Sequence, residues 1–526
     1  MFALAEVFVL VWYDRCSMRS CEFERAEIEM GISNPSTSVC SDYSTPEAIA
    51  SRASVLEGKT FQDILDMGVY PPDGATRDYD NRQYKGGMGT LVEERFFGYK
   101  ANSEHDADFP EAGVELKVSC FDKKKNGDYS AGERLVVSMI PYDEPIQSEF
   151  DDAVVARKCK RMMLVYYHRD KAIDPYQQQI RYAKLFEIPE NDLKIIRDDY
   201  RKIASLVQEG KADRLSESLT VYLGACTKGP TAAKSWVDQY YAPGGPKAKK
   251  RAFCLKRQYM DYVLHHYLMN ESEDLDCIIK GDAPATQTFE DYVLSLIKPH
   301  FGKTDRELCE EFGLEYKGNK RQWSSLSYAM LGVRGEKAQE FEKANISVRT
   351  VRLETRGGIK ENLSLDTFKF LDLVEEDWEG SSLFEYLEQT RFFFVVFRKE
   401  DGCARLEDAL FWSMPTMDLD GPVHDCWQAT KKVVEEGVCL DVTRQRDGSI
   451  RVKNNLPGAE DNAVAHVRPH ATKSAYRFAD GTELGDVERD AYPLPDGRMM
   501  TRQSFWLNNS YIYKVVKTDE SDAADS

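Results

Sequence analysis

The sequence predicts a mixed α/β protein in which one short strand carries charged side chains. Residues Gly113–Val118 alternate between polar and apolar side chains, as a strand with one buried face does. This alternation places Glu115 and Lys117 on one face and apolar residues on the other. Segments with helical spacing, such as Asp192–Gln208, lie between further apolar runs. Helical and strand patterns thus alternate along the chain, which is typical of an α/β protein.

The elements expected in the first half begin near Ser44. Thr45-Pro46-Glu47 is typical of a helix start, with a capping threonine and a proline in the first turn. Further helices are expected at Thr60–Met67 and Gly86–Phe97, and strands at Arg134–Ile140, Met162–Tyr167 and Leu219–Thr227. The second half is expected to begin with helices at Thr288–Ile297, Thr304–Phe312 and near Leu326–Leu331, and to contain a buried strand at Phe392–Phe397.

The strand at Glu115 is the strongest candidate for chemistry. Asp108 lies at its entrance, so two carboxylates and the Lys117 ammonium meet at one place. Two hard oxygen ligands suit Mg²⁺, which prefers few carboxylates plus waters and a phosphate oxygen. Water activated there could cut a phosphodiester, and Lys117 could hold that water or neutralise developing charge. The alternative is a solvated ion pair, because the Glu-x-Lys spacing recurs at Glu57/Lys59, Glu209/Lys211 and Glu315/Lys317. Those three copies lie outside any clear strand pattern, which distinguishes Glu115 from them.

Three segments in order are far more specific than this spacing. They are Lys85-Gly-Gly-Met-Gly-Thr-Leu-Val-Glu93, Phe97-Gly-Tyr, and Asp108-Phe-Pro-Glu-Ala-Gly-Val-Glu-Leu-Lys117. Together they resemble the signature of the MutH family, which contains a mismatch-repair nicking endonuclease and the Sau-three-A type of restriction endonuclease.

The resemblance implies a restriction-endonuclease-like fold, in which helices flank a mixed sheet. It also implies dependence on Mg²⁺ and recognition of GATC in double-stranded DNA. It also implies roles for individual residues. Asp108 and Glu115 would be metal ligands, and Lys117 the catalytic lysine. Glu93 would help to position the site from a helix, and Lys85 would approach the phosphate.

The most basic stretch of the chain runs from Gly244 to Arg257, with tyrosines beside it. Basic residues on a flexible loop before a helix suit phosphate contact, although such runs are usually solvated. In the MutH family the matching Thr-Lys-Gly turn and Phe-x-Leu-Lys segment lie on the DNA side. Lys228, Lys256 and Arg257 are therefore candidate DNA contacts.

The second half echoes the first. Ala344–Thr350 aligns with Ala112–Val118, which places Ser347 on Glu115 and Arg349 on Lys117. Serine supplies no carboxylate, and arginine does not replace a lysine's compact charge without rearrangement. We therefore expect a second MutH-like domain that lacks the metal site. The resemblance favours DNA binding or regulation over a purely structural role, with Arg468, Asn508 and Asn509 as candidate contacts.

These observations predict a domain order. Residues 1–44 are an N-terminal extension without an assigned function, 45–275 a catalytic MutH-like domain, and 276–287 a linker. Residues 288–517 form the degenerate MutH-like DNA-binding or regulatory domain, and 518–526 an acidic disordered tail.

Composition and the absence of certain motifs exclude several classes of function. The net charge of -19 argues against a nonspecific DNA-coating protein, but a specific enzyme depends on the local field in its cleft. The 12 cysteines show no zinc-type spacing and suit a reducing cytoplasm. No membrane segment and no nucleotide-binding motif is visible, so neither a membrane nor ATP is expected as a partner.

The prediction from the sequence is a two-domain type II restriction endonuclease that uses Mg²⁺ to cut double-stranded DNA at GATC. It would either pair with a second copy on DNA or nick each strand in turn. Two alternatives stay open. One is a MutH-like strand-nicking repair endonuclease, which the second half disfavours. The other is a catalytically inactive DNA-binding regulatory protein.

Overall fold

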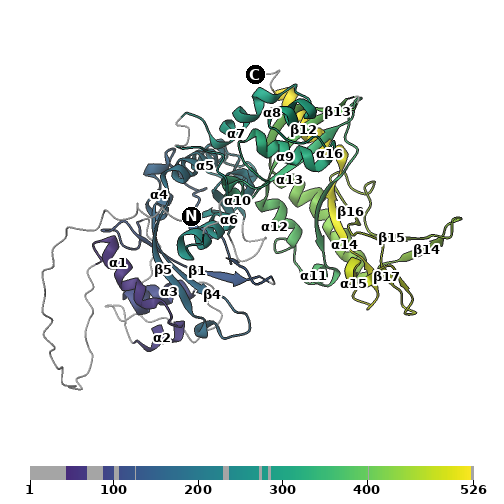
Figure 1. Ribbon diagram of the computed structural model, residues 1–526. Coiled ribbons are helices and arrows are strands. Elements are labelled where there is room, and N and C mark those ends of the chain that lie inside the picture. Colours follow the sequence, from purple (N-terminus) through teal and green to yellow (C-terminus); the bar gives the residue numbers. More distant parts are fainter. Residues whose placement is uncertain are drawn as a thin grey trace, which may run out of the picture. The chain divides into compact units, whose positions relative to one another are not determined.

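The structure is a computed structural model that describes residues 43–67, 87–99, 106–124, 126–228, 236–271, 275–281, 286–400 and 402–522 (Figure 1). Almost all of the predicted N-terminal extension, residues 1–44, lies outside these ranges, and so does Lys85. Within them, no helix combines the length and the apolar character needed to cross a membrane.

The first half is built on a mixed sheet with the order β2-β1-β4-β5. Strand β1 (Glu115–Lys123) pairs in parallel with β4 (Arg161–His168), and β4 pairs antiparallel with β5 (Ile180–Glu187). Strand β2 (Tyr129–Ala131) pairs antiparallel with β1. The predicted strand at Gly113–Val118 is thus confirmed, although it starts two residues later and runs further.

Helices cover both faces of this sheet. On one face, α1 (Pro46–Ala53), α2 (Phe61–Asp66) and α3 (Gly87–Val92) share a core with Val114 and Leu116 of the β1 region (Figure 1). Thr45 caps α1 as expected, and Thr60 caps α2. On the other face, α5 (Glu190–Gln208) packs in a core that includes Phe121, Leu164 and Phe186.

A second sheet completes the first half. Its order is β3-β9-β6, from β3 (Leu135–Met139), β9 (Arg251–Leu255) and β6 (Leu223–Thr227). Helix α6 (Arg257–Val263) follows β9 directly. Shorter elements are α4 (Val154–Cys159), β7 (Trp236–Val237) and β8 (Ala248–Lys249).

The second half repeats this plan, which confirms the internal repeat. Strand β10 (Ile346–Leu353) pairs in parallel with β12 (Arg391–Glu400), which pairs antiparallel with β13 (Cys403–Trp412), as β1, β4 and β5 do. A sheet β11-β21-β16 mirrors β3-β9-β6, with β11 (Leu363–Phe368), β21 (Gln503–Leu507) and β16 (Ala465–Pro469). The register also agrees, because Glu115 faces Met162 and Ser347 faces Phe392, in each case the second residue of the partner strand.

The other elements of this half surround the two sheets. The helices are α7 (Phe289–Ile297), α8 (Asp305–Glu311), α9 (Lys320–Met330), α10 (Gln339–Ala344), α11 (Phe370–Glu375), α12 (Ser382–Gln389), α13 (Thr416–Asp418), α14 (His424–Glu436), α15 (Val487–Asp490) and α16 (Asn509–Asp522). The small strands are β14 (Leu440–Arg444), β15 (Ile450–Asn454), β17 (Tyr476–Arg477), β18 (Glu483–Leu484), β19 (Ala491–Pro493) and β20 (Met499–Thr501).

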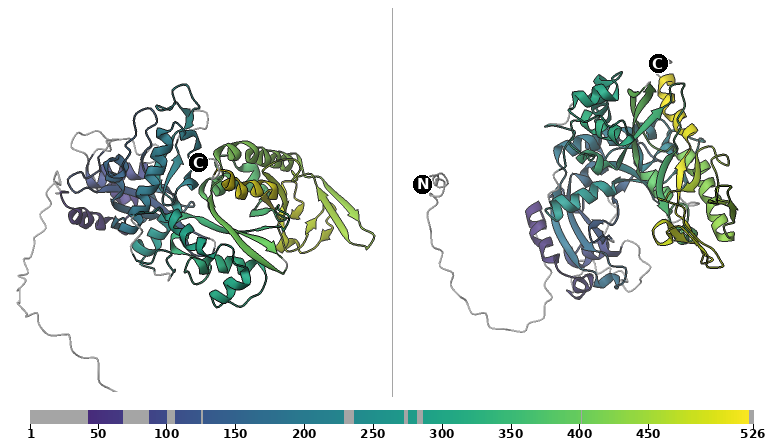
Figure 2. Two further views of the ribbon diagram at one scale, coloured as in Figure 1. Left: turned by 90° about the horizontal axis from the view of Figure 1, so that it is seen from above. Right: turned by 45° about the vertical axis from the view of Figure 1, so that its right-hand side comes forward.

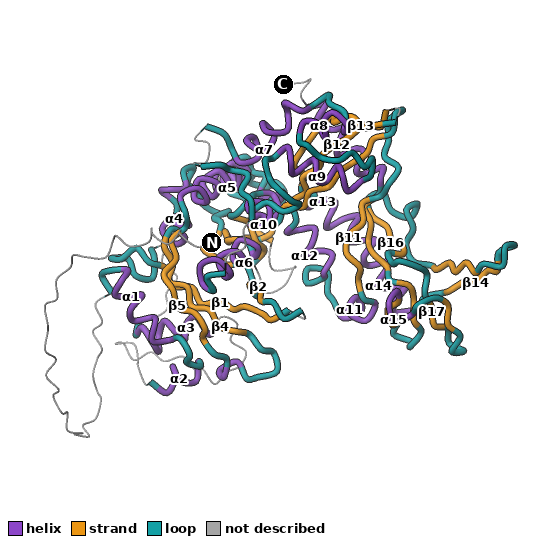
Figure 3. Tube along the Cα trace, viewed as in Figure 1, coloured by secondary structure: helices purple, strands orange, loops and turns teal. Residues whose placement is uncertain are grey.

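The second half also contains a projecting hairpin and a C-terminal helix that is longer than predicted. The β14–β15 hairpin projects away from the neighbouring elements (Figures 2 and 3). Helix α16 continues through residues 518–522, which contradicts the prediction that the disordered tail starts at 518. A helix already formed adds each further residue at little cost, even in an acidic segment.

The two halves are joined by packing and by buried charge. Ile278, in the predicted linker, is 1% exposed and belongs to the same hydrophobic cluster as Leu264 and Phe341. Lys343 on α10 forms a buried ion pair with Asp192 at 3.0 Å. The described part of the predicted linker, residues 276–281, therefore does not separate two independent cores.

A second buried ion pair corrects the interpretation of the basic stretch. Arg251, predicted to lie on a flexible basic loop, is instead buried in β9 and pairs with Glu388 of α12 at 2.7 Å. Lys249 pairs with Glu379 and Asp420. These cations are neutralised by the second half of the chain, a partner that local sequence does not reveal.

Replacing Glu388 by alanine should lower the free energy of unfolding by about 3–5 kcal/mol, because it leaves a buried guanidinium without its counter-ion. The double variant Arg251→Met/Glu388→Met should recover most of that loss. Urea unfolding followed by circular dichroism measures both. Glu483→Ala, which removes an exposed ion pair with Arg477, is the matched control and should cost below about 1 kcal/mol. Equal stability of Glu388→Ala and this control would contradict the assignment.

Candidate active site

A tight hairpin brings the two predicted metal ligands together. Phe109 and Val114 exchange backbone hydrogen bonds at 2.9 and 3.2 Å, and Gly113 adopts a φ of 62° in the turn between them. Glycine adopts this conformation without steric cost. The turn places Asp108 beside the first residue of β1. The backbone N–H of Asp108 donates to Glu115 Oε2 at 3.2 Å, and that of Leu116 donates to Asp108 Oδ2 at 2.9 Å.

Two lysines hold the buried carboxylate of Glu115. Its side chain is 3% exposed. Lys117 Nζ donates to Oε1 at 2.7 Å, and Lys158 Nζ lies 3.4 Å from both carboxylate oxygens. Lys158 was not predicted from the sequence. It lies on α4, which leads into β4, and the pairing of β4 with β1 carries it to the site across 43 positions.

The acidic groups of the site repel one another. Burial, followed by the charge of Asp108, raises the pKa of Glu93 to about 7. Burial, followed by the charge of Glu115, raises the pKa of Asp108 to about 6. Glu93 is half-buried at the junction between α3 and a π-helical turn, Glu93–Phe97. Three carboxyl groups, those of Asp108, Glu115 and Glu93, thus share the site with two lysines, and a cation would stabilise their ionised forms.

These residues fit a divalent metal ion of the hard type. The described part of the chain holds no group of three or more His, Cys, Asp or Glu side chains placed to bind a metal. A site of two carboxylates nevertheless suits an ion that keeps several waters and takes its other oxygens from a phosphate. Asp108 and Glu115 supply such carboxylates.

Tyr99 is a second residue that sequence reasoning missed. It follows the π-helical turn, and its ring contacts Phe109 at 5.4 Å between centroids. Burial, together with the charges of Asp108 and Glu93, raises the pKa of Tyr99 well above its ordinary value. It lies within the Phe97-Gly-Tyr motif, but nothing in that motif indicates contact with the carboxylates.

The predicted DNA contacts of the first half divide into two groups. Lys228 is exposed at the end of β6. Arg257 is half-buried, and its Nε donates to the carbonyl of Ala131 at 2.8 Å. Lys256 is 1% exposed, and its ammonium donates to the carbonyl of Thr220. Burial lowers the pKa of Lys256 to about 8. This burial contradicts the prediction that Lys256 contacts DNA.

The candidates of the second half divide in the same way. Arg468 is exposed and its guanidinium stacks 4.9 Å from the Trp506 ring centroid. Asn508 is buried, bonded to His466 Nδ1 at 2.6 Å, and donates to the carbonyl of Asn462. Its amide is therefore used inside the fold, which contradicts the prediction that it contacts DNA. Asn509 donates to the carbonyl of Ile359 at 2.6 Å.

Comparison with known proteins agrees with this geometry. The family model described as DNA mismatch repair enzyme MutH matches residues 97–199. The type II restriction enzyme Sau3AI of Staphylococcus aureus is 35% identical over 501 residues, which cover 90% of this chain and 99% of that protein.

Mismatch repair proteins match only part of the chain. MutH of Vibrio campbellii is 25% identical over 227 residues, 42% of this chain and 94% of that protein. MutH of Escherichia coli is 25% identical over 231 residues, 43% of this chain and 94% of that protein. The similarity to the restriction enzyme extends over nearly the whole length of both proteins, and the chain belongs to the family of the type II restriction enzyme Sau3AI.

Proposed function

We propose that the chain is a type II restriction endonuclease that hydrolyses double-stranded DNA at GATC with Mg²⁺. The observation that supports this most is the pair of carboxylates, Asp108 and Glu115, held beside two lysines at the start of β1. The full-length similarity to a type II restriction enzyme supports the reaction class. The GATC target is the one that the family resemblance implies.

In this proposal Asp108 and Glu115 would hold the metal ion. When bound, Mg²⁺ supplies an activated water and stabilises negative charge on the phosphate. Lys117 orients that water and neutralises charge that develops on the phosphate, since its ammonium already lies 2.7 Å from Glu115. Lys158, on α4, also neutralises the carboxylate of Glu115. By the family resemblance, Glu93 would position the site and Lys85 would approach the phosphate. The oxygen of the attacking water would bond to phosphorus as the 3′ oxygen of the sugar leaves.

Cutting a palindrome requires two events. GATC has one scissile bond on each strand, and the described residues contain one carboxylate–lysine site. We propose that two chains pair on DNA or that one chain nicks the strands in turn. Cleavage of both strands by a monomeric complex within one binding event would contradict both routes.

Lys117→Ala should lower the rate of cleavage of a plasmid with GATC sites by about 10²-fold or more, because it removes a group that assists proton transfer and charge stabilisation. Wild-type protein should give discrete fragments ending at GATC with Mg²⁺ and none with EDTA. Lys317→Ala is the matched control. It has the same Glu-x-Lys spacing but forms an exposed ion pair at 3.7 Å, and it should cut like wild type.

The same assay separates the alternatives. Nicked circles as the only product would favour a strand-nicking repair endonuclease. DNA binding without cleavage in wild-type protein would leave a DNA-binding regulatory protein and contradict the catalytic proposal.

Metal binding should depend on pH. Folding raises the pKa values of Asp108 and Glu93, so the folded chain holds these protons more tightly than the unfolded chain does. The free energy of unfolding of the metal-free protein should therefore fall as pH rises from about 4 through about 7, where these groups ionise. Bound metal reverses that loss but must displace protons at lower pH, which raises the apparent Kd about tenfold per pH unit for each proton displaced. The increase in Tm on adding Mg²⁺ should be larger at pH 8 than at pH 5, and absent in Asp108→Asn. Equal increases at both pH values would contradict this arrangement.

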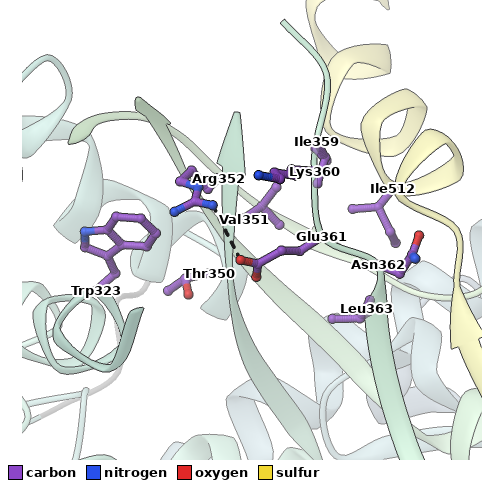
Figure 4. A pocket seen from close by; sticks show the side chains of 10 residues that line it. All are labelled: Trp323, Thr350, Val351, Arg352, Ile359, Lys360, Glu361, Asn362, Leu363 and Ile512. Carbon is purple, nitrogen blue, oxygen red and sulfur yellow. Dashed lines mark hydrogen bonds and ion pairs between the residues drawn. The ribbon is translucent and has the colours of Figure 1, made fainter. Parts of the chain in front are cut away.

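We propose that the second half binds duplex DNA without cutting it. A cleft of about 860 Å³ is lined by Arg349, which lies in the register of Lys117. An adjoining pocket shares part of this lining, and there Arg352 pairs with Glu361 at 3.5 Å beside Lys360 (Figure 4). Cations of the cleft outnumber its carboxylates; the lining includes Arg321, Arg349, Arg352, Lys360 and Arg468 against Glu361 and Asp366.

Arg349→Ala/Arg468→Ala should weaken duplex binding by the second half and reduce its salt dependence. Each lost phosphate contact should reduce the slope of log K against log salt by about 0.9. Fluorescence anisotropy across salt concentrations, in a Lys117→Ala background, measures both effects. The matched control is Arg334→Ala/Arg477→Ala, which removes two exposed cations outside the cleft. The same slope for both double variants would contradict a DNA-binding cleft.

A further inference from the structure

The hydroxyl of Tyr99 is buried but has no hydrogen-bond partner among the described residues. Its ring packs edge-on against Phe109 and tilts toward Phe97 at 6.4 Å. Tyr43 packs on the same two phenylalanines, and its hydroxyl donates to the carbonyl of Phe97 at 3.1 Å. A buried polar group left unpaired, like the Tyr99 hydroxyl, is unfavourable and calls for an explanation.

The surroundings of this hydroxyl identify what could bind it. Phe109, which fixes the ring, directly follows Asp108, and the charges of Asp108, Glu93 and Glu115 all act on the Tyr99 phenol. No carboxylate oxygen forms a hydrogen bond with it. A group that binds this hydroxyl must therefore accept or donate a hydrogen bond and tolerate the negative charge of the nearby carboxylates.

We infer that Tyr99 is a positioning residue whose hydroxyl holds a water of hydration that enters with the divalent metal ion. A phenol both donates and accepts hydrogen bonds, and buried waters typically bridge polar groups that are otherwise unpaired. Ions of the Mg²⁺ type keep several of their waters when bound by few carboxylates. This inference rests on the metal site of the proposed function and adds a residue to it.

The alternative is that Tyr99 only packs in the aromatic cluster. Tyr99→Phe distinguishes the two, because it keeps the ring and removes only the hydroxyl. Tyr142→Phe is the matched control. Tyr142 is 3% exposed and its hydroxyl also lacks a partner among the residues described, but the charges acting on it are those of Arg251 and Cys226.

The measurement is isothermal titration of the full-length chain with Mg²⁺ in the absence of DNA, together with the Mg²⁺ concentration that gives half-maximal cleavage. Tyr99→Phe should weaken Mg²⁺ binding about tenfold and raise that concentration to match, as the loss of one hydrogen bond in a charged site implies. The cleavage rate at saturating Mg²⁺ should recover toward wild type. Tyr142→Phe should leave both midpoints unchanged.

A double variant keeps the test decisive. In an Asp108→Asn background, which removes a metal ligand, Tyr99→Phe should have little further effect on Mg²⁺ binding. Unchanged Mg²⁺ affinity in Tyr99→Phe would overturn the inference and leave the proposed function intact. Additive effects in the double variant would overturn it as well. Wild-type protein that binds no Mg²⁺ would instead overturn the proposed function, and this inference with it.

Discussion

The buried carboxylate of Glu115 is the constraint on which the first half depends. A carboxylate at 3% exposure is stable only with compensating charge, and Lys117 and Lys158 supply it from two different elements. That compensation requires β1 and β4 to be parallel neighbours, with α4 leading into β4. It also requires the hairpin at Phe109–Val114 to hold Asp108 against the strand. The site is therefore a product of sheet pairing as much as of its own residues.

The repeat shows how the same scaffold serves two purposes. Lys158 lies three residues before Arg161, where β4 begins, and Glu388 lies three residues before Arg391, where β12 begins. In the first half this position neutralises the carboxylate of the site. In the second half it is a carboxylate that pairs with Arg251 and joins the halves. Ser347 and Arg349 stand in place of Glu115 and Lys117 in the second copy. This copy keeps the strand pairing but lacks the metal-binding carboxylate, and its cleft is lined mainly by cationic side chains.

Local patterns predicted what depends on neighbours in sequence. The alternation at Gly113–Val118, the threonine cap of α1 and the repeat all correspond to elements of the structure. Local patterns failed where long-range contacts decide. Lys256 and Asn508 are of residue types that usually lie on the surface, but both are buried and hydrogen-bonded to groups that are distant in sequence. Lys158 and Tyr99 were missed because only the fold brings them to the carboxylates.

The most direct test of the account is a crystal structure of the chain with a GATC duplex and Mn²⁺, whose anomalous scattering locates the ion. An anomalous peak is expected between the carboxylates of Asp108 and Glu115, close to a backbone phosphate, and none at Ser347 in the second half. A peak bound elsewhere in the chain, with Asp108 and Glu115 still occupied only by lysine and backbone contacts, would contradict it.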